Sequence, residues 1–132
     1  PRRQAFLAAL QKHFAVRIVD KVFGVELQQL VASAKLVANI HYYEGALLET
    51  TRLSEAMSLG VPVVSETAAD QADHELLSEA VCFTPMGDIE AMITSIAALL
   101  RDPVRYVAQV DAVANLQRTD SRFAHAIVSF FQ

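Results

Sequence analysis

The stretch from Tyr42 to Glu66 limits the folds open to this chain more than any other part of its sequence. Within it, four residues recur at the three- and four-residue spacing of a helix with one apolar face: Leu53, Ala56, Met57 and Gly60. Gly60 and Pro62 end that helix at Leu59, because glycine accepts the left-handed conformation after a last turn and proline cannot continue a helix. The run Pro-Val-Val-Ser at residues 62–65 is then typical of an interior strand of a parallel sheet.

The start of this helix carries polar groups suited to an anionic ligand. Thr50 or Thr51 can cap it, and its first backbone N–H groups, which lack partners within the helix, face the loop of residues 44–49. Arg52 and Glu55 lie off the apolar face, where an arginine fork suits a phosphate and a carboxylate suits two sugar hydroxyls. The pair favours a nucleotide diphosphate with its ribose, and a plain exposed ion pair along the helix is the alternative.

Residues 52–64 resemble the donor-site motif of group 1 glycosyltransferases with the GT-B architecture. That family carries Glu-Ala-Met-x-x-Gly-x-Pro-Val-Val, and a compact branch of it also carries an arginine where Arg52 stands. The resemblance continues in order along most of the chain. It covers residues 25–37 for a Glu-Leu helix and an Ala-Asp segment, 83–88 for a Pro-x-Gly-Asp turn and 99–103 for a Leu-Leu-x-Asp ending.

The resemblance implies roles for particular residues. In the family, the glutamate matching Glu55 holds the ribose hydroxyls, backbone amides of the preceding loop hold the diphosphate, and backbone groups of the loop matching residues 22–24 hold the base. A basic residue where Arg2 stands often reaches the donor phosphates, although a solvated residue near the end of the chain is the alternative. The candidate donor-binding residues are therefore Glu55, Arg52, Thr50, Thr51, Gly45, Val22, Phe23, Gly24 and Arg2.

One position departs from the family pattern. The family commonly has an earlier glutamate, separated by seven residues from the one matching Glu55, and here that position is Leu47. Glu44 lies too far upstream and Glu49 too near, so either could act on the donor sugar only if the loop is rebuilt. Both are catalytic candidates, and the sequence assigns the catalytic residue to neither.

The rest of the chain alternates between expected helices and strands. Helices are expected at residues 1–14, 25–35, 75–80, 88–100, 103–117 and 120–131, and strands at 15–20, 36–43 and 81–85. This order predicts a Rossmann-like α/β fold of three αβα layers, with a mostly parallel sheet of about four strands and extra C-terminal helices. No Gly-x-Gly-x-x-Gly, Walker lysine motif or serine nucleophile elbow is found, which disfavours dinucleotide oxidoreductases and phosphate-loop ATPases.

The 132 residues have the length of one domain. The chain opens on a helix, without the strand and glycine loop that the family would place before it. We therefore expect residues 1–132 to be the C-terminal donor-binding domain of a longer, two-domain GT-B chain. A net charge of −4 with 11 scattered Lys and Arg argues against a nucleic-acid surface. The single Cys82 favours a reducing compartment, hence the cytoplasm, and no apolar run suits a transmembrane segment.

The expected function is transfer of a sugar from a nucleotide diphosphate sugar to a glycan, lipid-linked or small-molecule acceptor. By resemblance, the acceptor side would belong to the missing N-terminal domain, and no metal or other cofactor is expected. The cluster Asp70, Asp73, His74 and Glu75 matches no tight metal-ligand motif.

A non-catalytic interaction domain is the alternative class, and a receiver-like domain is its closest example. Asp20 is isolated, however, and Thr84 rather than a lysine precedes Pro85, so a receiver site is not assembled. A glycosyltransferase-like scaffold without catalysis remains open, because a fold does not fix a function.

Overall fold

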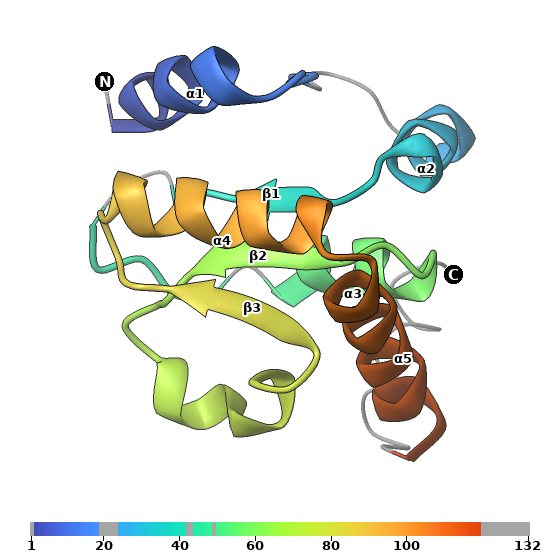
Figure 1. Ribbon diagram of the computed structural model, residues 1–132. Helices are drawn as coiled ribbons and strands as arrows, with labels where there is room; N and C mark the ends of the chain where they lie inside the picture. Colours follow the sequence, from blue (N-terminus) through green and yellow to red (C-terminus); the bar gives the residue numbers. More distant parts are fainter. Residues whose placement is uncertain (1, 19–23, 42–43, 49, 120–132) are drawn as a thin grey trace.

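The computed structural model describes residues 2–18, 24–41, 44–48 and 50–119. Within these residues lies one parallel sheet in the order β1-β2-β3, made of β1 (Val37–Asn39), β2 (Val63–Glu66) and β3 (Val81–Thr84). Val63 lies opposite Val37 on one side and Val81 on the other, which sets the register of all three strands. Helices lie on both sides of this sheet (Figure 1), so the expected Rossmann-like αβα fold is confirmed.

Successive residues of β2 point to opposite faces and divide the core in two. Val63 packs with α3 (Thr50–Ser58), the 3-10 helix η1 (Gln71–Leu77) and α5 (Pro103–Thr119). Val64 packs with α1 (Arg2–His13) and α4 (Ile89–Arg101) on the other face. The remaining helix, α2 (Gly24–Ser33), contacts α3. No helix within the described part of the chain is long and apolar enough to cross a membrane.

The turn between α3 and β2 has the geometry that its sequence predicts. Gly60 has a φ of 75°, its N–H donates to the Met57 carbonyl at 3.0 Å, and the N–H of Val61 donates to the Ala56 carbonyl at 3.0 Å. These two bonds and the left-handed glycine form a Schellman motif. The chain is thereby turned directly into the buried strand β2, which places the polar start of α3 and the end of β2 at the same edge of the sheet.

Several expected boundaries are wrong. Residues 15–18 form no strand, and none of their described backbone groups bonds to β1; Ile18 is 56% exposed. A β-branched run needs a bonded neighbour to become a strand, and local propensity does not supply one. The sheet therefore has three strands in the described residues rather than about four. The expected helix at 75–80 is instead η1, with a kink at His74. Residues 19–20 and the expected helix 120–131 lie outside the described residues.

Candidate functional site

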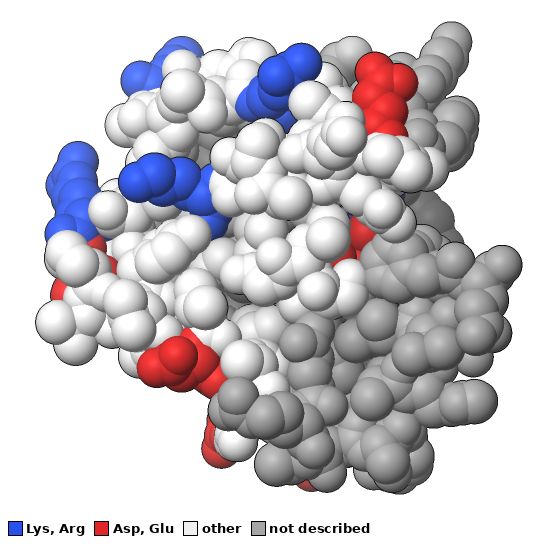
Figure 2. All heavy atoms as spheres, turned by 90° about the vertical axis from the view of Figure 1, so that its right-hand side faces the viewer, with Lys and Arg blue, Asp and Glu red and all other residues white. Residues whose placement is uncertain are grey.

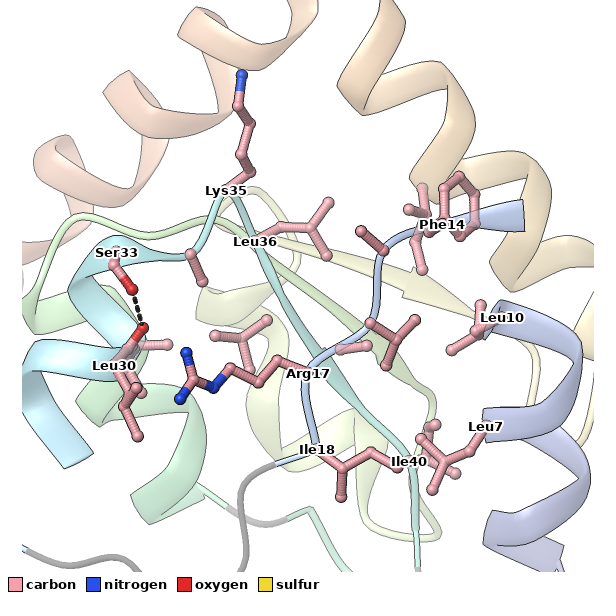
Figure 3. A pocket seen from close by; sticks show the side chains of 18 of the residues that line it. Leu7, Leu10, Phe14, Arg17, Ile18, Leu30, Ser33, Lys35, Leu36 and Ile40 are labelled. Atoms are coloured by element: carbon pink, nitrogen blue, oxygen red, sulfur yellow. Dashed lines mark hydrogen bonds between the residues drawn. The ribbon is translucent and has the colours of Figure 1, made fainter. Parts of the chain in front are cut away.

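A groove of about 980 Å³ lies beside the outer edge of β1. Its lining comes from α1, residues 14–18, α2 and β1, together with residues of α3 and α4. Figure 3 shows that the walls are mainly aliphatic and aromatic, and the labelled side chains of this kind are Leu7, Leu10, Phe14, Ile18, Leu30, Leu36 and Ile40. Such a groove can accept a flat or apolar group while polar residues at its margin orient it.

The charged residues that line this groove are mostly basic. Arg3, Arg17, Lys35 and Arg52 contribute four cations, and Glu55 contributes the one carboxylate among the described residues of the lining. In Figure 3, Arg17 reaches toward Leu30, while Lys35 points away from the other labelled side chains. The face that carries α2 shows the same bias, because its basic side chains gather in the upper half of Figure 2. A chain with a net charge of −4 therefore concentrates positive charge where an anion could enter.

Arg52 and Glu55 both reach the groove from α3, as their spacing predicts. Arg52 is exposed, and its Nη1 donates to Oδ1 of the buried Asn39 at 3.2 Å. Glu55 is half-buried, and this burial raises the pKa of its carboxyl group. The structure thus brings a guanidinium and a carboxylate into the lining of the same groove, the pairing that a diphosphate and a ribose would need.

Arg2 lies at the carboxyl edge of the sheet, where Glu66 holds it. Both of its terminal nitrogens donate to the Glu66 carboxylate, one of them at 2.8 Å, and Nη1 also donates to the His41 carbonyl at 3.0 Å. Glu66 is fully buried and accepts further bonds from the N–H groups of His41 and Gly87, each at 2.8 Å. Burial alone would raise the pKa of Glu66, but Arg2 and the two backbone donors hold it below its usual range.

The ends of the three strands carry buried polar residues that sequence reasoning did not single out as a site. Asn39, Ser65, Glu66 and Thr84 are each at most 2% exposed, and His41 just beyond β1 is fully buried. Nδ1 of His41 and Oγ1 of Thr84 have no hydrogen-bond partner among the described residues. The sequence could have indicated these residues, because each apolar strand has polar residues at its carboxyl end. Open α/β sheets bind ligands at that end of their strands.

The described part of the loop before α3, residues 44–48, contains two of the candidate residues, Glu44 and Gly45. Glu44 is exposed and its carboxylate lies beside Gly87, close enough to contribute to the raised pKa of Arg2. The N–H of Gly45, expected to face a diphosphate, donates to the Met86 sulfur at 3.1 Å. Leu47, where the family pattern has a glutamate, is 65% exposed.

The same loop is anchored to the segment before η1. The Ala69 N–H donates to the Ala46 carbonyl at 3.0 Å, and the Leu48 N–H donates to Oδ1 of Asp70 at 2.9 Å. Oδ2 of Asp70 lies 2.8 Å from Nε2 of His74, and these interactions lower the pKa of Asp70. Asp70 and His74 therefore hold the loop in place.

The remaining candidates fall partly outside what the structure describes. Gly24 begins α2 with a φ of 64° and does not line the groove. Thr50 and Thr51 begin α3, but their side chains lie outside the described part of the chain. Val22, Phe23 and Glu49 also lie outside the described residues.

Comparison with known protein families gives one match. The model of the family described as "Glycosyl transferases group 1" matches residues 1–102, a stretch that includes Arg52, Glu55 and every element from α1 to α4. A comparison with curated proteins found no match.

Proposed function

This chain belongs to the group 1 glycosyltransferases, and we propose that it binds a nucleotide diphosphate sugar for transfer of the sugar to an acceptor. The donor nucleotide would lie in the β1 groove beside Arg52 and Glu55. The observation that carries this proposal is that these two residues, three apart on α3, line one groove whose other charged residues are basic. The family match supports glycosyl transfer in general, and the groove supports an anionic, nucleotide-like ligand.

The proposed mechanism is electrostatic. As the bond between sugar and diphosphate breaks, negative charge grows on the leaving diphosphate, and fixed positive groups lower the energy of that state. The Arg52 guanidinium and the positive end of the α3 dipole would supply such positive charge without a bound metal. The Glu55 carboxylate would accept hydrogen bonds from the ribose hydroxyls and so fix the donor in one orientation.

The acceptor side completes the proposal. We place the acceptor, a glycan, a lipid-linked molecule or a small molecule, on a second domain of a GT-B architecture. Any carboxylate acting on the donor sugar would come from the loop with Glu44 and Glu49 or from that second domain. A cytoplasmic location fits the single, half-buried Cys82. The isolated chain should therefore bind donor nucleotide but turn over little of it.

Calorimetric titration with UDP, GDP and ADP tests the proposal. We expect one nucleotide to bind and its affinity to fall about tenfold, about 1.4 kcal/mol, in Arg52→Ala and in Glu55→Gln. Arg105→Ala removes an equal charge from the exposed face of α5 and serves as the control, with affinity unchanged. If none of the three nucleotides binds at millimolar concentration to a demonstrably folded chain, the donor site is refuted and the non-catalytic scaffold becomes the better interpretation.

A further inference from the structure

Asn39 is a buried polar residue whose side chain connects the sheet to Arg52. It ends β1, is fully buried, and lies directly opposite Ser65 of β2 in the strand pairing. Its Nδ2 group donates to Oγ of Ser65 at 3.0 Å, and its Oδ1 accepts from Nη1 of Arg52 at 3.2 Å. A fully buried amide costs free energy unless both of its ends are paired, and here both ends have partners.

Ser65 determines which way the Asn39 amide faces. The Ser65 hydroxyl donates its only proton to the Glu66 carbonyl at 2.9 Å, so its oxygen can only accept from Asn39. The NH₂ group of Asn39 must therefore face Ser65, and its oxygen must face Arg52. The buried sheet thus presents an acceptor of fixed direction to the guanidinium of the exposed residue Arg52.

We propose that Asn39 is a positioning residue, which holds the Arg52 guanidinium in place in the groove before the donor arrives. A long arginine side chain that is already ordered loses less freedom when it binds a ligand, so the restraint improves affinity. One hydrogen bond to Asn39 uses only part of the five N–H donors of the guanidinium. The proposal rests on the proposed function in a single respect, that Arg52 contacts the donor diphosphate.

The order of the Arg52 side chain tests the restraint without any ligand. The ¹⁵N heteronuclear NOE of its Nε–Hε group, assigned by the loss of that signal in Arg52→Lys, should fall clearly in Asn39→Ala. Asn39→Asp keeps an acceptor for Arg52, and the Ser65 hydroxyl can rotate away from the Glu66 carbonyl to donate to the new carboxylate, so this variant should retain the NOE. It also serves if Asn39→Ala does not fold. An Arg52 side chain that stays as ordered in Asn39→Ala as in the wild type, or that loses its order in Asn39→Asp, overturns the proposal.

A double-mutant cycle measures the effect on binding. With the nucleotide of UDP, GDP and ADP that binds best, Asn39→Ala should weaken affinity about fivefold, about 1 kcal/mol, in the wild-type background. In the Arg52→Ala background the same change should have no further effect, because there is no guanidinium left to hold. An equal loss in both backgrounds overturns the positioning role. If Arg52→Ala binds as well as the wild type, the donor role of Arg52 fails instead, and the NOE still decides whether Asn39 orders it.

Discussion

Replacement of Arg2 by alanine should destabilise this protein strongly, because it would leave a buried charge without its counter-ion. The Glu66 side chain has no exposed surface, and four hydrogen bonds satisfy its carboxylate. Two of these bonds come from the Arg2 guanidinium and two from backbone N–H groups of His41 and Gly87. In Arg2→Ala the carboxylate would remain buried with the two backbone donors alone.

The magnitude follows from the two hydrogen bonds that Arg2 donates to Glu66. A hydrogen bond to a charged group contributes about 1.5–3 kcal/mol, so two of them give about 3–6 kcal/mol. Removal of one partner from a buried ion pair costs about 3–5 kcal/mol. The Arg2 side chain is 17% exposed, so water already screens part of the pair and the lower end applies. We therefore expect the free energy of unfolding to fall by about 3 kcal/mol, out of the roughly 5–15 kcal/mol of a typical domain.

The loss should depend on pH in a definite direction. In the wild type the pKa of Glu66 is lowered, so its stabilising contribution is complete above the unfolded pKa and is lost as pH falls through the folded value. Without Arg2, burial should raise the pKa of Glu66, and protonation then removes the buried charge. The difference in stability between wild type and Arg2→Ala should therefore shrink from pH 7 to about pH 4.

Urea unfolding followed by circular dichroism at both pH values measures this difference. Arg105→Ala is the control, because it removes the same charge from the exposed surface of α5. This control should change the free energy of unfolding by less than about 0.5 kcal/mol, and the change should depend little on pH. An Arg2→Ala loss below about 1 kcal/mol at pH 7, or one that does not shrink in acid, would refute the view that Arg2 neutralises a buried charge.

Four further outcomes are expected. Met57→Ala removes a fully buried side chain and should lower the free energy of unfolding by about 2–5 kcal/mol in urea titration, whereas a loss below about 1 kcal/mol would contradict its place in the core. Gly60→Ala meets no atom within 4 Å, so it should cost only the strain of its positive φ, about 1–2 kcal/mol, and Gly60→Asn should cost less. Asp88→Ala removes the cap that accepts the Ala91 N–H at 2.9 Å and should lower the melting temperature by the equivalent of about 1 kcal/mol, while Asp88→Ser should recover most of it. Burial raises the pKa of Glu55, so its carboxylate should be protonated earlier than an exposed glutamate as the pH is lowered, and nucleotide affinity should fall with it. Calorimetry of Glu55→Gln from neutral pH to about pH 4 should show no such fall.

The sequence predicted those parts of the fold that local rules decide. The end of α3 at Gly60 depends on one glycine and a following proline, and the cap of α4 depends on Asp88, so both could be found without knowledge of distant neighbours. Residues 15–18 could not be placed in the same way, because a strand exists only where a neighbour accepts its hydrogen bonds.

In the candidate site, too, the residues that local sequence patterns reveal differ from those that depend on distant neighbours. Arg52 and Glu55 were found because they lie on one helix, and a helix fixes the direction of residues three apart. Asn39 became visible only when the strand register placed it opposite Ser65. Arg2 and Glu66 are 64 positions apart in the sequence, so no local pattern could reveal that they pair.

The helix α5 is bonded to the amino ends of β1 and β3, the edge of the sheet opposite the one that carries Asn39, Glu66 and Thr84. The Tyr106 hydroxyl donates to the Lys35 carbonyl just before β1, and Nε2 of Gln109 donates to the Ala80 carbonyl just before β3. Both bonds secure the amino ends of strands whose carboxyl ends carry Asn39 and Thr84. This 17-residue helix lies beyond the stretch that the family shares. Substitutions in α5 should therefore change the heat tolerance of the protein while leaving Arg52 and Glu55 on α3 in place.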